Sequence, residues 1–157
     1  GMMIDMSHAA ESSFYDALAL SQAPIVCSHS SSRALCSHPR NLTDDQMKAL
    51  AAQGGVAQVT LYHGFLRHEG EATVLDALDH LHHMVQVMGP EHVGIGTDFD
   101  GDGGVRGLKD ASELIGFTRQ LLRRRYSESD LQGIWGGNFL RVMRQVQSSA
   151  TSHLGLS

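Results

Sequence analysis

Two histidines, His8 and His29, are the residues of this sequence best suited to hold a metal ion. Imidazole is the commonest metal-binding side chain in proteins. The two residues are 21 positions apart, a spacing typical of one strand–helix–strand unit. If each follows a strand, both rings lie at the ends of neighbouring parallel strands, where they can reach one cation. Alternatively, each ring only caps its strand or binds a loop carbonyl.

Hydroxyl groups flank this histidine pair and can orient the rings. Ser7, Ser28 and Ser30 are immediate neighbours of the two histidines, and hydrogen bonds from such neighbours commonly fix metal ligands. Cys27 lies two residues before His29 on the same strand face, so a Cys–His nucleophile pair is conceivable. We expect a buried structural thiol instead, because same-face neighbours on a strand seldom turn towards each other.

An acidic loop begins at Asp98, where another predicted strand ends. Residues 98–103 read DFDGDG, which resembles the start of a calcium-binding loop. Such a loop needs a glutamate at its twelfth position, which is Lys109 here, so calcium binding is not expected. Asp98 is therefore predicted to be a catalytic or substrate-binding carboxylate. The alternative is an ordinary Asp-Gly turn.

Arg40 is the candidate for binding an anionic group. It follows Pro39 and precedes a predicted helix start, in the loop beyond the strand of His29. A guanidinium group can hold a carboxylate through two parallel hydrogen bonds. Arg40 can therefore be a substrate-binding residue, and the alternative is a surface arginine without a ligand.

The elements that must position these residues alternate between strands and helices. Short apolar runs predict strands, and helical spacing with capping residues predicts helices. The predicted strands are residues 2–7, 25–28, 56–61 and 92–97, and the predicted helices are residues 10–20, 43–53, 73–88, 110–125 and 127–146. This order predicts an α/β fold with four parallel strand–helix units and an extra C-terminal helix. A frayed Ser-rich tail is expected after it.

Composition limits the classes of protein to consider. The 157 residues, 41% of them hydrophobic, suffice for one domain. A formal net charge of −5 argues against binding of nucleic acid, which needs a basic face. No apolar run approaches the roughly 20 residues of a membrane span, and the lack of a signal-peptide pattern favours a cytoplasmic location. Of the ten histidines, His80, His82 and His83 are expected on the solvated face of one helix.

Five segments, in order and spacing, resemble the membrane (renal) dipeptidase family of zinc peptidases. They are residues 1–8, 23–31, 39–45, 93–101 and 137–142. The resemblance extends from Gly1 to about Val146 and corresponds to the C-terminal half of the family's (β/α)8 metallohydrolase barrel, a TIM-like fold. It implies a half-barrel domain over residues 1–147, followed by a tail over residues 148–157.

The resemblance also implies roles for individual residues. His8 and His29 resemble two ligands of one zinc ion. Arg40 resembles the arginine that grips the carboxylate of a dipeptide, and Asp98 resembles the acid near the attacking water and the substrate amine. Tyr62 lies near a stretch that contacts substrate.

The family's other zinc ligands, among them a His-x-Asp pair and a bridging glutamate, belong to an N-terminal half that has no counterpart here. We therefore predict zinc-dependent hydrolysis of dipeptides, with this chain carrying at most one half-site of a two-zinc centre. The expected partners are a dipeptide and either a second copy or the missing half. The alternative is an incomplete fragment that dimerises and binds at most one metal without turnover. A further alternative is another amide or ester hydrolase on the same barrel. Its substrates would lack a free carboxylate and would not need Arg40.

Overall fold

The structure, a computed structural model, describes residues 1–153, with side chains as far as residue 150. Its centre is a three-stranded parallel sheet in the order β1-β2-β3. The strands are β1 (Val26–Cys27), β2 (Val56–Val59) and β3 (Val93–Ile95). Val26 lies beside Val56 in the register, and Val59 lies beside Ile95. The predicted α/β fold with a parallel sheet is confirmed.

The first of the four predicted strands is reduced to a single bridge. Asp5 pairs in parallel with Val26. The Val26 N–H donates to the Ile4 carbonyl, and the Met6 N–H donates to the Val26 carbonyl, both at 2.9 Å. The pairing stays short because the segment has a partner on one side only and the chain turns directly after Met6. The prediction of a strand over residues 2–7 is wrong in extent, although the segment lies beside β1 as expected.

Helices follow the strands in the predicted order. The α-helices are α1 (Glu11–Leu20), α2 (Asp44–Ala52), α3 (His63–Leu66), α4 (Val74–Met88), α5 (Leu114–Arg123), α6 (Glu128–Gln132) and α7 (Asn138–His153). Two short 3₁₀ helices, which are wound more tightly than an α-helix, form η1 (Pro90–His92) and η2 (Ala111–Glu113). A wider π-turn forms η3 (Gly133–Gly137).

The C-terminal helix differs from its prediction. A single helix over residues 127–146 is wrong, because the backbone is non-helical at Gly136 and this break separates α6 from α7. Helix α7 then continues to His153, so that residues 148–153 of the expected Ser-rich tail are helical. Residues 154–157 lie outside the described residues.

Capping boxes start α2 and α4 at the predicted places. At α2, the Thr43 hydroxyl accepts from the Gln46 N–H at 3.1 Å, and the Gln46 side chain accepts from the Thr43 N–H at 3.0 Å. At α4, the Asp76 carboxylate accepts from the Thr73 N–H at 2.7 Å. Each box pairs N–H groups that the first turn of a helix leaves without internal partners. These local patterns fix where the two helices begin.

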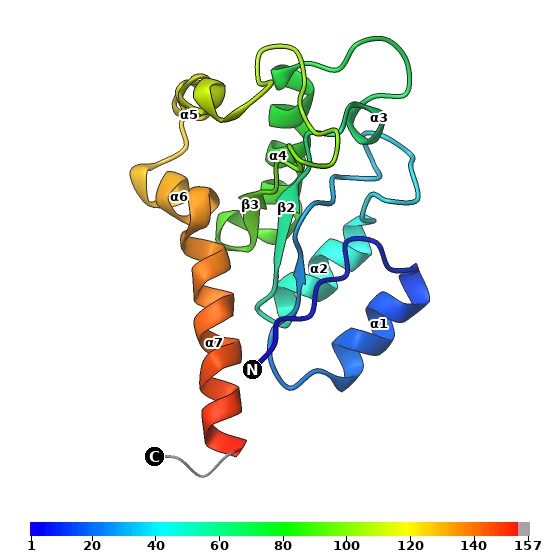
Figure 1. The fold of residues 1–157 in the computed structure, drawn as a ribbon, viewed down its shortest axis with the longest axis vertical. Coiled ribbons are helices and arrows are strands. Elements are labelled where there is room, and N and C mark those ends of the chain that lie inside the picture. Colours follow the sequence, from blue (N-terminus) through cyan, green and yellow to red (C-terminus); the bar gives the residue numbers. More distant parts are fainter. Residues whose placement is uncertain (154–157) are drawn as a thin grey trace.

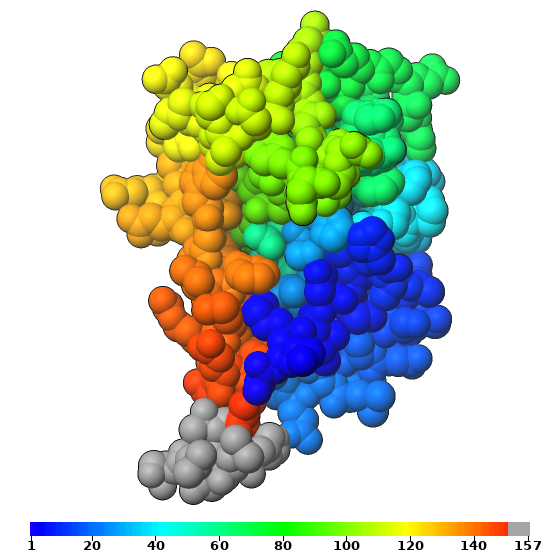
Figure 2. Space-filling model, in the orientation of Figure 1, coloured from blue at the N-terminus to red at the C-terminus, as the bar shows by residue number. Residues whose placement is uncertain are grey.

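Two apolar clusters cover the two faces of the sheet. Ala57 and Val59 belong to the larger cluster, which includes residues of α2 and α4. Val26 and Val56 pack instead against Val142 of α7. Successive side chains of a strand point to opposite faces, which explains this division. Figure 1 shows α7 and α1 on opposite sides of the central strands, and Figure 2 shows the N-terminal residues (blue) against α7 (red).

The strands all point the same way, so their C-terminal ends meet at one end of the sheet. Ligands bind in the loops at this end in parallel α/β folds. The loop after β1 is anchored by a parallel bridge between Ser32 and Leu42. Within residues 1–153, no helix is both long and apolar enough to cross a membrane.

Candidate metal and substrate site

The structure brings His8 and His29 together at the end of β1. Their Nε2 atoms are 2.8 Å apart, and their ring centroids are 4.8 Å apart. His29 comes just after β1, and His8 comes just after the bridging residue Asp5 beside it. Neighbouring parallel segments thus carry both rings to one point, in the arrangement that their spacing in the sequence predicts.

A hydrogen-bond network supports His29 from behind. Its Nδ1 lies 2.8 Å from Ser28 Oγ, and the Ser28 hydroxyl donates to Asp5. Asp5 also accepts from the backbone N–H groups of Ser28 at 3.0 Å and Ser7 at 3.1 Å. Burial acts to raise the pKa of Asp5, but the hydrogen bonds from Ser28 and Ser7 outweigh it and hold the pKa below its usual value. Asp5 is therefore a carboxylate at neutral pH.

Arg40 reaches the histidine pair from the loop after β1. Its Nη2 lies 3.2 Å from His8 Nε2, and its guanidinium carbon lies 5.2 Å from the centre of the Phe65 ring, within cation–π range. Asn41 fixes this loop by donating to the carbonyls of Cys36 at 2.8 Å and Phe65 at 2.7 Å. In the described part of the chain, the buried Nη1 of Arg40 has no hydrogen-bond partner. A buried N–H group without a partner costs free energy, so any acceptor brought within its reach would be favourable.

A cavity of about 310 Å³ opens beside this guanidinium, between α1 and the loop before α2. Arg33 and Arg40 both line it, but Arg33 is paired with Glu11 at 3.1 Å. Ser30 also lines the cavity, and among the described residues its buried hydroxyl has no partner. Arg40 and Ser30, each with an unpaired buried polar atom, thus both lie in the wall of this cavity. Ser30 does not contact either histidine ring through its hydroxyl, unlike the expected role.

Asp98 lies in the loop after β3 and starts a tight turn. Its φ is 57°, and its carbonyl accepts from the N–H groups of Gly101 at 2.9 Å and Gly103 at 2.7 Å. Its carboxylate is also within electrostatic reach of the site: burial lowers the pKa of both His29 and Arg40, and the charge of Asp98 opposes that effect. Asp98 is thus a turn residue whose charge also acts on the site.

Tyr62 packs against His63 and Phe65 and not against the histidine pair. It caps the N-terminus of α3 and is half-buried. Its ring centroid is 4.6 Å from that of Phe65 and 5.0 Å from that of His63. Because Phe65 packs against Arg40, Tyr62 borders the site through the Phe65 ring.

Burial sets the protonation of two neighbouring residues. It lowers the pKa of His29, and the charge of Arg40 acts in the same direction. The His29 ring is therefore neutral at neutral pH, which is the form that binds metals. Burial also raises the pKa of the Cys27 thiol to about 12. This thiol stays protonated and is no nucleophile, as the sequence predicts.

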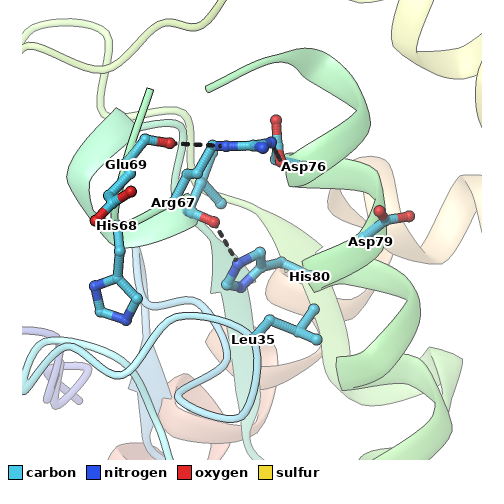
Figure 3. A pocket seen from close by; sticks show the side chains of 8 residues that line it. Leu35, Arg67, His68, Glu69, Asp76, Asp79 and His80 are labelled. Atoms are coloured by element: carbon cyan, nitrogen blue, oxygen red, sulfur yellow. Dashed lines mark hydrogen bonds and ion pairs between the residues drawn. The ribbon is translucent and has the colours of Figure 1, made fainter. Parts of the chain in front are cut away.

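The histidines of α4 are used in a different way. His80 is only 2% exposed; its Nδ1 accepts from the Ser32 N–H at 3.0 Å, and its Nε2 lies 3.1 Å from the Leu66 carbonyl oxygen. Figure 3 shows this second contact at the wall of a cavity of about 460 Å³. The prediction of a solvated position is wrong for His80. His83 Nε2 lies 2.8 Å from an oxygen of Asp44.

Three residues that hold the site are not evident from the sequence: Asp5, Asn41 and Phe65. Asp5 is an acid inside a short apolar segment, and this pattern is the one available signal. Asn41 is 1% exposed, and Phe65 packs on a loop far from it in the sequence. No local pattern reveals such partners, because they meet only in the folded chain.

Comparisons with known proteins find relatives along the whole chain. The family model that matches residues 1–154 is described as membrane dipeptidase, peptidase family M19. Human dipeptidase 3 is 43% identical over 148 residues, which are 94% of this chain and 30% of the relative. An uncharacterized dipeptidase of Schizosaccharomyces pombe is 40% identical over 151 residues, which are 94% of this chain and 36% of the relative. The chain spans about a third of the length of these curated relatives.

Solved structures share this arrangement of strands and helices. The probable dipeptidase PvdM from Pseudomonas aeruginosa has a TM-score of 0.90 and 30% identity, over 94% of this chain and 51% of that one. A metallo peptidase from Rhodobacter sphaeroides, solved with a phosphinate mimic of the dipeptide L-Ala-D-Ala, has a TM-score of 0.86 and 31% identity, over 91% of this chain and 42% of that one.

Proposed function

Because this chain belongs to the membrane dipeptidase family, peptidase family M19, we propose that it carries part of a zinc-dependent site for the hydrolysis of dipeptides. The observation behind the proposal is the meeting of His8 and His29 beside Arg40, with the charge of Asp98 in reach. Together these side chains offer two metal-binding nitrogens, a cation for a carboxylate, and an anion for an ammonium group or a proton.

The chemistry of the histidine pair suits a zinc ion. Zinc binds imidazole nitrogens at about 2.0–2.1 Å, and two tetrahedral ligands then lie about 3.3 Å apart. The two Nε2 atoms are 2.8 Å apart, so a small outward movement of the rings would admit the ion. Zinc, when bound, polarises a substrate carbonyl and lowers the pKa of water.

Arg40 would bind the carboxylate of the dipeptide. Its buried Nη1 has no partner among the described residues, and a guanidinium group holds a carboxylate best through two parallel hydrogen bonds. A free carboxylate one residue from the scissile bond distinguishes a dipeptide from a long peptide. Asp98 would hold the substrate ammonium group or accept a proton. Tyr62, together with Phe65, would border the bound side chains.

We further propose that the remaining metal ligands come from outside this chain's described residues. The segment around Asp5 and strands β1, β2 and β3 fill four strand positions, which is half of an eight-stranded barrel. Open strand edges tend to pair with further strands. A second copy of the chain, or a polypeptide equivalent to the other half, would close these edges and add carboxylate ligands.

One observation favours a second candidate function, the binding of a single metal without turnover. Within residues 1–153, no three His, Cys, Asp or Glu side chains gather in a way that could hold a metal ion. A two-metal hydrolase holds two ions close together, with a carboxylate between them. Two imidazole ligands alone supply no such carboxylate, so they can hold one zinc ion only. In this case the chain would bind metal, and dipeptides would not be cleaved.

The test measures binding and cleavage separately on the zinc-loaded chain. Calorimetry follows binding of the phosphinate mimic of L-Ala-D-Ala, and a product assay follows cleavage of L-Ala-D-Ala and of its C-terminal amide. Arg40→Lys keeps the charge and removes the planar fork, so we expect binding to weaken about 10–100-fold, in line with about 1.5–3 kcal/mol for charged hydrogen bonds. Arg67→Lys is the matched control, because Arg67 is paired with Asp76 at 2.9 Å, on another part of the surface.

The outcomes separate the candidates. Cleavage that requires the free carboxylate and Arg40 supports the dipeptidase proposal. Cleavage of the amide at the same rate as the free dipeptide contradicts the role of Arg40 and favours another amide hydrolase. Binding of zinc without cleavage of any substrate favours the second candidate for this chain.

A further inference from the structure

The hydrogen bonds behind His29 have a direction that follows from simple chemistry. Asp5 is ionised, so its oxygens can only accept. The Ser28 hydroxyl therefore has to donate its single proton to Asp5. Ser28 Oγ is then left only with acceptor capacity for its other contacts, which are His29 Nδ1 at 2.8 Å and the more distant Ser7 Oγ at 3.4 Å. His29 consequently has to donate from Nδ1, and its Nε2 carries a lone pair.

The opposite side of the pair is governed by Arg40. A guanidinium group can only donate, so His8 Nε2 acts as the acceptor for Arg40 Nη2 at 3.2 Å. Both facing Nε2 atoms then carry lone pairs at a separation of 2.8 Å. Two lone pairs at this distance repel each other, and a cation placed between them removes the repulsion. The pair is thus set up to receive a cation.

We propose that Asp5 is a positioning residue, which acts through Ser28 to fix His29 as the Nδ1–H tautomer and so presents Nε2 as a metal ligand. This inference rests on the proposed function only for the identity of the metal. Outer hydrogen bonds that fix the tautomer of a ligating histidine typically change metal affinity by about 10–100-fold when removed. The backbone bonds from Ser7 and Ser28 to Asp5 Oδ1 hold the carboxylate in place for this role.

Asp5→Asn is the sharpest variant, because it keeps the shape and reverses the direction of the network. The backbone N–H groups of Ser7 and Ser28 still find an acceptor in the amide oxygen. The amide nitrogen now donates to Ser28 Oγ, which frees the Ser28 proton for His29 Nδ1. His29 then carries its proton on Nε2, where it blocks metal binding.

Ser28→Ala and Ser7→Ala form a matched pair of controls. Ser28→Ala removes the link between Asp5 and the ring, so the tautomer preference should be lost. Ser7→Ala also removes a hydroxyl from the same network, but this hydroxyl accepts from the His29 backbone N–H at 2.9 Å, lies 3.4 Å from Ser28 Oγ and does not contact the ring. Ser7→Ala should therefore leave the tautomer unchanged.

The measurement is the tautomer of His29 in the metal-free full chain, read from two-bond 1H–15N correlations of 15N-histidine-labelled protein. It is made at about pH 8, above the ordinary histidine pKa of about 6.5. We expect the Nδ1–H form in the wild type and in Ser7→Ala, and a shift to the Nε2–H form in Asp5→Asn. Zinc titration of the same samples should show affinity about 10–100-fold lower for Asp5→Asn and nearly unchanged for Ser7→Ala.

Two results would overturn the inference: an Nε2–H tautomer in the wild type, or the same tautomer in the wild type and in both Asp5→Asn and Ser28→Ala. Amide spectra that remain dispersed show that a variant is folded, and Ser28→Ala provides the answer if Asp5→Asn is not. A tautomer that responds as expected, in a chain that binds no zinc, upholds the positioning role and contradicts the proposed function instead. Zinc binding with a tautomer that responds to neither Asp5→Asn nor Ser28→Ala contradicts the positioning role and supports the proposed function.

Discussion

The histidine pair at the end of β1 and the histidines of α4 (Val74–Met88) use the same side chain for different purposes. In the pair, the Nε2 atoms of His8 and His29 face each other at 2.8 Å. On α4, both ring nitrogens of His80 are bonded to the backbone, at 3.0 Å to the Ser32 N–H and at 3.1 Å to the Leu66 carbonyl. One region brings two ring nitrogens face to face, and the other uses both nitrogens of one imidazole to bond the backbone in the core.

The difference shows that the number of histidines in a segment does not decide whether their rings converge. Three histidines lie within four positions of α4, but they point to separate partners: His83 to Asp44, and His82 to Tyr126 at 3.0 Å. What distinguishes the site is that two rings from neighbouring strand ends converge. Substitutions in the two regions should therefore affect different quantities, metal affinity in one and stability in the other.

The largest expected effect on stability comes from His80→Ala. This change leaves the buried Ser32 N–H and Leu66 carbonyl without partners and opens a cavity, so we expect a loss of about 2–5 kcal/mol in the free energy of unfolding. His8 is exposed, and His8→Ala should change the same quantity by less than about 0.5 kcal/mol. Urea denaturation followed by circular dichroism compares the two variants. Similar losses in both would contradict the division between the regions.

A smaller effect is expected from pH, with a sign set by burial. Burial lowers the pKa of His80 from its ordinary value of 6.5, so between these two values the unfolded chain binds more protons than the folded one. The contribution of neutral His80 is complete above about pH 6.5 and is lost as the pH falls towards the folded-state pKa. Denaturation at several pH values should show this decline, and His80→Gln should reduce it. An equally steep decline in His80→Gln would assign the effect to other groups.

The smallest effect is expected from His83→Ala. The side chains of His83 and Asp44 are 23% and 40% exposed, and such exposed pairs contribute up to about 1 kcal/mol. Thermal unfolding of the variant and the wild type measures this loss. A loss of several kcal/mol would mean that His83 is a core residue like His80.

Much of the framework could be predicted because the signals are local. The capping boxes at Thr43 and Thr73 fix two helix starts within four residues of sequence, and short apolar runs locate the strands. The break at Gly136 is not visible in the spacing of the apolar residues, and its local signal is the glycine-rich run over residues 133–137. The length of the first strand was not predictable either. Its pairing is limited to one bridge, between Asp5 and Val26, and the apolar run of the sequence does not show how many residues pair.

The candidate site divides in the same way. The spacing of His8 and His29 relative to predicted strand ends was enough to bring them together, because parallel strands place their ends at one edge. The parts that were missed depend on distant segments. Asp5 contacts Ser28 across 23 positions, and Asn41 bonds the carbonyl of Phe65 across 24. The buried position of His80 could not be predicted for the same reason, since its hydrogen-bond partner Ser32 is 48 positions away.

Zinc titration of the metal-free chain tests the central claim most directly. The wild type should bind about one zinc ion per chain, as a shared pair of imidazole ligands requires. His8→Ala and His29→Ala should each abolish this binding, while the double variant His82→Ala/His83→Ala, which loses two imidazoles from α4, should bind like the wild type. Undiminished binding in His29→Ala, or loss of binding in the α4 double variant, would contradict the assignment of the metal site to the end of β1.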